Sequence, residues 1–276
     1  MTRPSHRRLQ ATVFALVSAA FTNIYVTQPV LPVLQAEFGS DLVTVSFSVS
    51  AVILGIALAN LPFGSLADRA PVHPIILGGG GAVALAGLVC ALTPSLAVLI
   101  GARFVQGLFI PALTTCLAAY LAKTLPVARL NVVMGSYVAA TVLGGLGGRL
   151  LGGWIHPPLH WRYAFVSASA FILIATAAAL RWLPRAPVAP GGRTGTVGFL
   201  TLLRRWELVR LYLCAAGSFA LFSSVFNYLP FRLAEPAFGF STERTTLVYL
   251  VYVIGIFMGP TAGRISNRVG TGAILL

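Results

Sequence analysis

Two arginines stand inside long apolar stretches of this sequence, where a charged side chain is costly. Arg103 is followed one helical turn later by Gln106 and Gly107, and Arg149 stands among glycines. An arginine within a membrane span faces the interior of a helix bundle or a water-filled cavity, where it finds hydrogen-bond partners. The two positions therefore indicate structural bonding, coupling or solute recognition within a membrane.

The acidic residues and histidines lie near the ends of the apolar stretches or between them. The acids are Glu37, Asp41, Asp68, Glu207, Glu235 and Glu243, and the histidines are His6, His73, His156 and His160. Membrane carriers usually move protons on carboxylates or histidines within a span, so residues 1–276 show no obvious proton carrier. Three explanations are open: the proton carrier lies beyond residue 276, Glu37 or Asp68 carries the proton despite its position, or the protein is a uniporter. We prefer the first.

The sequence contains no pattern for a metal, a nucleotide or another cofactor. The three cysteines, Cys90, Cys116 and Cys214, stand singly in apolar runs, and neither HExxH nor a Cys/His cluster occurs. No phosphate-binding G-x-x-x-x-G-K-[ST] sequence occurs, so ATP is not the expected driving force. We expect no metal and no cofactor.

The composition excludes most soluble proteins. Hydrophobic residues make up 57% of the 276 residues and charged residues 9%, with a mean hydropathy of +0.88. A soluble domain carries about 25% charged residues, and disordered chains are poor in apolar residues. The net charge of +13 comes from short basic clusters between apolar runs, which indicates membrane topology rather than binding to nucleic acid. We expect an all-α integral membrane protein embedded in the lipid bilayer.

Eight complete apolar runs are each long enough to span a bilayer. Their approximate limits are 11–34, 46–66, 74–93, 96–121, 131–155, 163–183, 208–231 and 244–263, and a ninth begins near Thr271. We expect residues 1–183 to form a six-helix bundle, 184–207 a linker rich in proline and glycine, and 208–276 an incomplete second bundle. Most basic residues fall on the side of the N-terminus and the linker, so the positive-inside rule places both in the cytoplasm.

The sequence repeats itself weakly at an offset of about 200 residues. Gly64 to Arg69 matches Gly263 to Arg268 as G-x-x-x-[D/N]-R, and Phe38-Gly39 matches Phe238-Gly239. Parallel repeats are a recurring construction in secondary transporters. The second unit holds two spans and the beginning of a third, so we expect the N-terminal part of a chain of roughly 400 residues. The rival interpretation is a natural short form that pairs with another subunit.

Three motifs, in order, resemble those of the major facilitator superfamily. Gly64 to Arg69 resembles its G-x-x-x-D-R loop signature, although Ala70 to His73 departs from the continuation of that signature. Arg103 to Gly107 resembles its R-x-x-Q-G sequence. Gly144 to Gly153 is similar to the G-x-x-x-G-P-x-x-G-G sequence of its drug-efflux antiporters, with Arg149 in place of proline. The resemblance implies the superfamily fold, with a complete first bundle and the first helices of the second.

The resemblance also implies roles for these residues. A gate between conformations is expected at Gly64, Asp68 and Arg69 and at their second copy, Gly263, Asn267 and Arg268. Gly64 would let two helices approach closely. Arg103, Gln106 and Gly107 are expected to act in coupling. The alternative for Arg103 is a structural arginine bonded to backbone carbonyls. The motif from Gly144 to Gly153 is expected to pack where the two bundles meet. An anionic substrate is one possible partner for Arg149, the cation that replaces proline in this motif. This packing motif comprises Gly144, Gly148, Arg149, Gly152 and Gly153.

Polar residues on the first and seventh predicted spans suit the lining of a cavity, because these helices line the central cavity in the superfamily that the chain resembles. The candidate substrate-binding residues are Asn23, Tyr25, Gln28, Asn227 and Tyr228. Interhelical hydrogen bonding is the alternative for each of them. Trp161 to Phe165 resembles the W-R-x-x-F start of the superfamily's sixth helix, where we expect an anchor at the membrane interface.

The resemblance implies a secondary transporter that moves a small organic solute, a drug or a sugar, by alternating access. We expect proton-coupled efflux across a bacterial inner membrane, and a monomer when the protein is complete. The alternatives are a facilitated uniporter and a non-transporting sensor or assembly subunit. An enzyme acting on lipids would need a catalytic constellation near one interface, which the scattered loop histidines do not supply, so we do not expect an enzyme.

Overall fold

The computed structural model describes residues 6–185 and 204–254, and all regular structure in these two ranges is helical. Most of the predicted linker, the end of the predicted eighth span, and the candidate gate residues Gly263, Asn267 and Arg268 lie outside the described residues. The elements are α1 (His6–Tyr25), η1 (Gln28–Val30), α2 (Leu31–Phe38), α3 (Leu42–Arg69), α4 (Val72–Leu92), α5 (Leu96–Leu113), α6 (Thr115–Thr124), α7 (Val127–Ile155), α8 (Arg162–Trp182), α10 (Trp206–Ala234), α11 (Thr242–Val248) and η2 (Tyr249–Val251).

In the described ranges, seven helical segments are long and apolar enough to cross a membrane. They are Arg7–Phe38, Leu42–Arg69, Val72–Leu92, Leu96–Thr124, Val132–Ile155, Arg162–Trp182 and Trp206–Ala234. They overlap the first seven predicted runs, so the prediction of a multi-pass, all-α membrane protein is confirmed. The first of these segments is built from α1, η1 and α2, and the fourth from α5 and α6.

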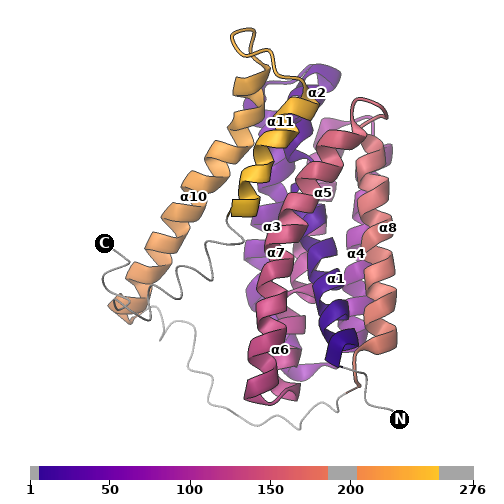
Figure 1. Ribbon diagram of the computed structural model, residues 1–276, viewed down its shortest axis with the longest axis vertical. Helices are drawn as coiled ribbons and strands as arrows, with labels where there is room; N and C mark the ends of the chain where they lie inside the picture. The colour runs from indigo at the N-terminus through magenta and orange to yellow at the C-terminus, as the bar shows by residue number, and fades with distance from the viewer. Residues whose placement is uncertain (1–5, 186–203, 255–276) are drawn as a thin grey trace.

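The first six segments form one bundle, which we call the first unit (Figure 1). In it α1 packs against α7 and α8, α4 packs against α8 and α5, and α3 packs against α5. The second unit, as described, consists of α10, α11 and η2. It meets the first unit through α2, η1, α3 and α7.

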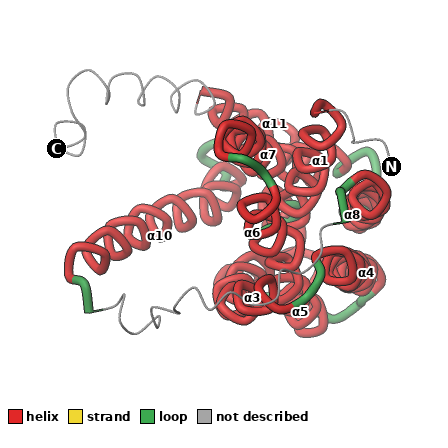
Figure 2. Tube along the Cα trace, turned by 90° about the horizontal axis from the view of Figure 1, so that it is seen from below, coloured by secondary structure: helices red, strands yellow, loops and turns green. Residues whose placement is uncertain are grey.

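Within the described residues, the contacts between the two units lie toward one end of the bundle. We call the end where α1 begins and α6 ends the N-terminal side, and the end with the α10–α11 turn the distal side. Figure 1 shows α10 close to α2 on the distal side and diverging from the bundle toward the N-terminal side. Figure 2, seen from the N-terminal side, shows the first half of α10 projecting away from the first unit. α10 and the first unit therefore diverge toward the N-terminal side.

The first membrane segment is interrupted between Tyr25 and Leu31. Pro29 lies in the first turn of η1 and Pro32 in the first turn of α2, and proline supplies no backbone N–H to continue a helix. α1 therefore ends at Tyr25, and its last carbonyl groups have no partner within the helix. This break matters for the site, because buried side chains from other helices bond at that end.

Glycines set the closest helix contacts in the first unit. A Cβ atom on Gly107 of α5 would lie 2.1 Å from the carbonyl oxygen of Val52 on α3. Three glycines of α7 lie equally close to backbone carbonyl oxygens of the first membrane segment. A Cβ atom on Gly144 would lie 2.4 Å from the Ser18 oxygen, one on Gly148 would lie 2.4 Å from the Thr22 oxygen, and one on Gly152 would lie 2.0 Å from the Val26 oxygen. These positions admit no side chain without moving a backbone.

The sequence repeat has a counterpart in the backbone. Gly39 after α2 and Gly239 after α10 both adopt left-handed φ angles, 57° and 59°, a conformation that favours glycine. Two residues later, the side chains of Asp41 and Ser241 cap the N-termini of α3 and α11 by accepting backbone N–H groups. The same turn therefore follows the first helical segment of each unit.

Candidate functional site

Arg103 is fully buried, and the end of α1 supplies two of its acceptors. Its Nη1 donates to the carbonyl of Asn23 at 2.6 Å, and its Nη2 donates to the carbonyl of Ile24. Its Nε donates to the carbonyl of Ser48 on α3 at 2.9 Å, and Nη1 also donates to Oε1 of Gln106 at 2.5 Å. The C-terminal end of a helix carries a partial negative charge that stabilises a cation. Arg103 thus joins α1, α3 and α5 at the point where α1 breaks.

Asn23 and Gln106 complete this network inside the first unit. The Asn23 amide donates to the carbonyls of Ala19 and Ala168, and Gln106 Nε2 donates to Asn23 Oδ1 at 3.1 Å and to the Val83 carbonyl at 3.2 Å. Asn23 and Gln106 have no exposed surface. The structure therefore places Asn23 among interhelical hydrogen bonds and not among the residues that line a cavity.

Arg149 is also buried, with 1% of its surface exposed, but its bonding is incomplete. Its Nε donates to Oε1 of Gln28 at 2.6 Å, and its Nη1 donates to the Gly145 carbonyl at 2.8 Å. The third nitrogen, Nη2, has no hydrogen-bond partner within residues 6–185 and 204–254. Both acceptors are neutral, so the guanidinium has an unused donor and an uncompensated charge in this part of the chain.

Aromatic rings from both units surround the Arg149 guanidinium. Its central carbon lies 3.9 Å from the ring centre of Tyr25 on α1 and 4.4 Å from that of Tyr252 in the second unit. The rings of Tyr249 and Phe226 lie at 5.5 and 5.9 Å. Cation–π contacts of this kind stabilise a desolvated cation without neutralising it.

A hydrogen bond across the two units adjoins Arg149. Gln28 uses its oxygen to accept from Arg149 and its nitrogen to donate to Oδ1 of Asn227 on α10 at 2.5 Å. Gln28 and Asn227 are 199 residues apart, close to the offset of the sequence repeat, so corresponding regions of the two units bond to each other. Next to them, a Cβ atom on Gly153 would lie 1.7 Å from the Thr246 hydroxyl of α11. The units are therefore tightly closed on the distal side at this level.

A small cavity of about 150 Å³ lies against Arg149. Both units line it, with Phe21, Tyr25, Thr141, Val142, Gly145, Arg149, Phe222 and Tyr252. The Tyr252 hydroxyl, like Arg149 Nη2, is buried without a partner in the described ranges. Two unused polar groups, one from each unit, therefore border the same cavity.

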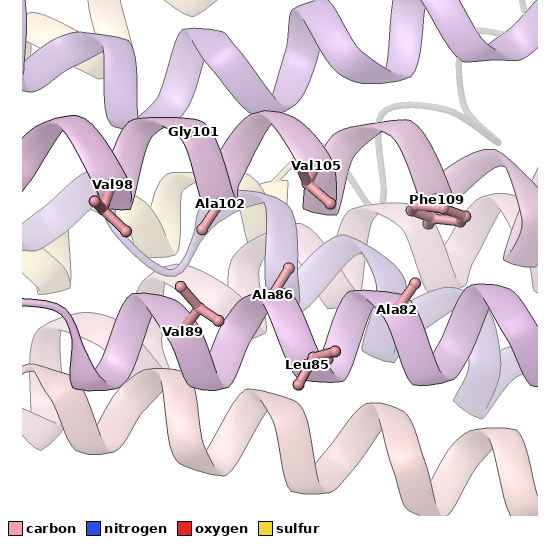
Figure 3. A pocket seen from close by; sticks show the side chains of 9 residues that line it. All are labelled: Ala82, Leu85, Ala86, Val89, Val98, Gly101, Ala102, Val105 and Phe109. Atoms are coloured by element: carbon pink, nitrogen blue, oxygen red, sulfur yellow. The ribbon is translucent and has the colours of Figure 1, made fainter.

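A larger hollow, about 550 Å³, lies between α4 and α5 and is not a candidate site. Its lining, drawn in Figure 3, is entirely apolar and includes Leu85, Val89, Val98 and Val105. These four side chains are 38–65% exposed, and α4 and α5 lie away from α10 (Figure 2). The hollow is a groove on the lipid-facing surface.

The structure gathers some of the predicted cavity residues and separates others. Tyr25, Gln28 and Asn227 meet at Arg149, whereas Asn23 lies in the Arg103 network and Tyr228 is 43% exposed on α10. Sequence analysis missed Tyr249 and Tyr252, although their spacing of three places both on one helical face. The expectation that the α7 glycines pack where the bundles meet needs correction. Gly144, Gly148 and Gly152 pack on α1 within the first unit, and Gly153 is the member that reaches α11.

The predicted gate residues of the first unit lie at the N-terminal side, where α3 ends. Asp68 accepts from Lys123 Nζ at 2.6 Å, and both side chains are largely exposed. Arg69 is exposed. A Cβ atom on Gly64 would have nothing within 4 Å among the described residues, so the expected close helix approach at Gly64 is not found there.

Trp161 was expected to anchor at the membrane interface, and this expectation was wrong. Its side chain is 1% exposed, packs against Phe38 and Phe165, and donates its indole N–H to Glu37. Arg162 donates to the same carboxylate at 2.9 Å and to the Thr93 carbonyl at 2.7 Å. The motif instead ties α8 to the ends of α2 and α4 on the distal side.

Comparison with known families settles the membership of the chain. The sequence profile described as Major Facilitator Superfamily matches residues 13–276. The chain belongs to the major facilitator superfamily. Members of this superfamily are transporters and not enzymes, so the predictions of fold class and of no enzyme activity are confirmed.

Relatives and solved structures agree with this membership. The chain is 26% identical over 277 residues to the inner membrane transport protein YnfM of Escherichia coli (strain K12), and 26% identical over 273 residues to a chloramphenicol resistance protein of Pseudomonas aeruginosa. These alignments cover 99% and 95% of this chain, but 66% and 62% of the relatives. The chain thus spans about two thirds of the length of these relatives.

The fold of this major facilitator chain matches solved transporter structures. A bacterial homologue of the human lysosomal transporter Spinster, in an inward-facing and unoccupied conformation, superimposes with a TM-score of 0.78 at 18% identity, covering 97% of this chain and 64% of the homologue. A D-xylose–proton symporter superimposes with a TM-score of 0.68 at 16% identity, covering 95% and 69% of the two chains. At these identities the likeness concerns the fold.

Proposed function

We propose that this chain belongs to a secondary active transporter that moves a small organic solute across the bacterial inner membrane by alternating access. The observation that carries the proposal is the Gln28–Asn227 contact, where the two units close on the distal side while α10 diverges on the N-terminal side. Rocking the units about such a level opens each side in turn. In this proposal the solute path runs between the two units.

The N-terminal side faces the cytoplasm in this proposal. In the described ranges, most basic residues near the ends of the spans lie on that side, in agreement with the positive-inside rule. The structure then corresponds to an inward-facing state, the state named for the Spinster homologue. The inner-membrane location follows the name of YnfM. We propose a monomer as the working unit.

The direction and driving force we propose are proton-coupled efflux. The name of the chloramphenicol resistance protein supports export of a drug-like solute, and that of the D-xylose–proton symporter supports proton coupling and a sugar-like alternative. In the described ranges the acids lie at helix ends, Glu37 and Asp68 among them, which keeps a facilitated uniporter as the second candidate. We retain the gating role for Asp68 and Arg69, and the coupling role for Arg103 through its hold on the broken end of α1.

A flux assay tests the proposal. The product of the complete gene is reconstituted in liposomes, and labelled chloramphenicol, D-xylose and benzoate are followed with and without a pH gradient. We expect at least one solute to move faster than in empty liposomes, and its flux to fall when a protonophore collapses the gradient. Flux unaffected by the protonophore favours the uniporter, and no flux of any solute contradicts transport.

A further inference from the structure

We propose that the cavity at Arg149 binds a small aromatic monocarboxylate. This inference rests on the proposed function, because it names the class of solute that the transporter takes. It starts from the difference between the two buried arginines of the first unit. Arg103 has four hydrogen bonds, to three carbonyls and a glutamine, whereas Arg149 has two bonds and an unused nitrogen beside a cavity.

The charge of Arg149 calls for an anion. A buried ion without a counter-charge is strongly unfavourable in a membrane, and such residues usually pair. Within residues 6–185 and 204–254 Arg149 takes part in no ion pair, since the described ion pairs involve Asp68, Glu37 and Glu235 with other partners. The surrounding tyrosine rings reduce the cost of burial but leave the full positive charge. An anionic ligand supplies the missing counter-charge.

The number of unused donors favours a single carboxylate. Arg149 Nη2 and the Tyr252 hydroxyl are both buried, unpaired and on the lining of one cavity. A carboxylate accepts hydrogen bonds on two oxygens, so one such group can satisfy a donor from each unit. A second carboxylate on the ligand would find only the hydroxyls of Tyr25 and Thr141 among the other lining side chains, with no second cation, and burying it with so few partners is costly.

The size and walls of the cavity favour one aromatic ring. Its volume of about 150 Å³ is smaller than the range of about 300–1,000 Å³ that drug-sized ligands occupy. Four of its eight lining residues carry aromatic rings: Phe21, Tyr25, Phe222 and Tyr252. Aromatic pairs gain energy beyond the area that they bury, so a planar ring attached to the carboxylate fits better than a polar sugar.

The cavity lies on the side of Arg149 from which a solute would arrive. On α7, Gly145 and Thr141 precede Arg149 by one and two helical turns, and on α1 Phe21 precedes Tyr25 by one turn. Both helices begin on the N-terminal side, so the cavity extends from Arg149 toward the side on which α10 diverges from the first unit. Because Tyr252 belongs to the second unit, the bound carboxylate would contact both units at the level where they close.

Equilibrium binding tests the inference without requiring flux. The purified product of the complete gene is titrated calorimetrically with sodium benzoate, with neutral benzamide, and with cationic benzylamine. We expect benzoate to bind at least tenfold more tightly than benzamide, and benzylamine not to bind. Arg149→Gln should lose at least tenfold in benzoate affinity. Tyr252→Phe should lose about tenfold, since a hydrogen bond to a charged group is worth at least that factor.

Matched controls keep the test decisive. Tyr212→Phe changes an exposed tyrosine of the same unit and should bind benzoate like the wild type. If Arg149→Gln does not fold, Tyr252→Phe carries the test, because it removes one hydroxyl from a partly exposed residue. Equal affinity for benzoate and benzamide, no benzoate binding, or unchanged binding by both cavity variants would overturn the inference.

The flux assay separates this inference from the proposed function. Solute flux without Arg149-dependent benzoate binding would leave the transporter in place and remove the anion site. Arg149-dependent binding without flux of any solute would leave the site in place and remove transport.

Discussion

Gly148→Ala should separate α7 from α1 and so disturb the position of Arg149. A Cβ atom at residue 148 would lie 2.4 Å from the carbonyl oxygen of Thr22 and 3.0 Å from its Cα atom, both backbone atoms. An ordinary contact begins at 3.4 Å, so the two backbones must move apart by about 1 Å, the difference between 3.4 and 2.4 Å. Overpacking of this kind costs about 1–3 kcal/mol.

The same shift has a consequence for the site. Arg149 follows Gly148 on α7, and its acceptor Gln28 lies just after α1. Adding about 1 Å to the present 2.6 Å separation gives roughly 3.6 Å, which is no longer a hydrogen bond. Gly148→Ala should therefore lower both the melting temperature and the affinity for benzoate.

Gly147→Ala is the matched control, because it makes the same change one residue earlier. The nearest neighbour of its Cβ atom, the Thr22 hydroxyl, lies at 3.7 Å, so no backbone has to move. Alanine is favoured over glycine in a helix by about 0.5–1 kcal/mol, and the melting temperature should stay the same or rise. Thermal unfolding of both variants in detergent measures the difference. Equal melting temperatures would refute the account of α1–α7 packing.

Three further predictions concern Arg103, the exposed Asp68 and the capping residue Asp41. Arg103→Lys should lower the melting temperature strongly, because one ammonium group cannot replace the four hydrogen bonds of the guanidinium, worth about 1.5–3 kcal/mol each. Lost flux at an unchanged melting temperature would instead indicate that Arg103 acts in coupling and not in stability. Asp68→Asn should slow flux but change the free energy of unfolding by less than about 1 kcal/mol, since its ion pair with Lys123 is exposed; wild-type flux would remove the gating role. Hydrogen bonds from the side chain and backbone of Thr44 hold the pKa of Asp41 below its usual value of 3.8. The ionised Asp41 cap therefore stabilises α3 at neutral pH. This stabilisation is lost as the pH falls below 3.8 and through the lowered pKa. Melting temperatures of the wild type and Asp41→Ala should differ at pH 7 and converge in acid, and a difference that persists in acid contradicts the role of the cap.

Composition and motif order were enough to predict the spans, the repeat and the two buried arginines. Each of these features depends on a local property of the sequence. The length of an apolar run indicates a membrane span, and a charged residue within such a run is rare and therefore easy to recognise. The turn at Gly39 and Gly239 was likewise visible as a repeated dipeptide. Such features need no knowledge of which helices are neighbours.

The pairing of helix faces could not be read from the sequence. Gly64 and Gly148 both stand in motifs, yet Gly148 touches a backbone and Gly64 has open space among the described residues. Trp161 has the sequence of an interface anchor, but Glu37 from a distant segment accepts its indole N–H and buries it. Tyr252 looks like any lipid-facing aromatic until the fold brings it to Arg149. For Gly148, Trp161 and Tyr252, the neighbour that decides the outcome is more than 100 residues away in sequence.

The most direct test of alternating access measures two distances in the same protein. Spin labels at Val132 and Leu211 report on the N-terminal side, and labels at Leu159 and Phe238 report on the distal side; all four residues are exposed. Cys214, also exposed, is replaced first, while Cys90 and Cys116 are buried. We predict two populations for each pair, with the N-terminal distance shortening in the state in which the distal distance lengthens. A single fixed distance on each side, unchanged by pH or by benzoate, would contradict the account.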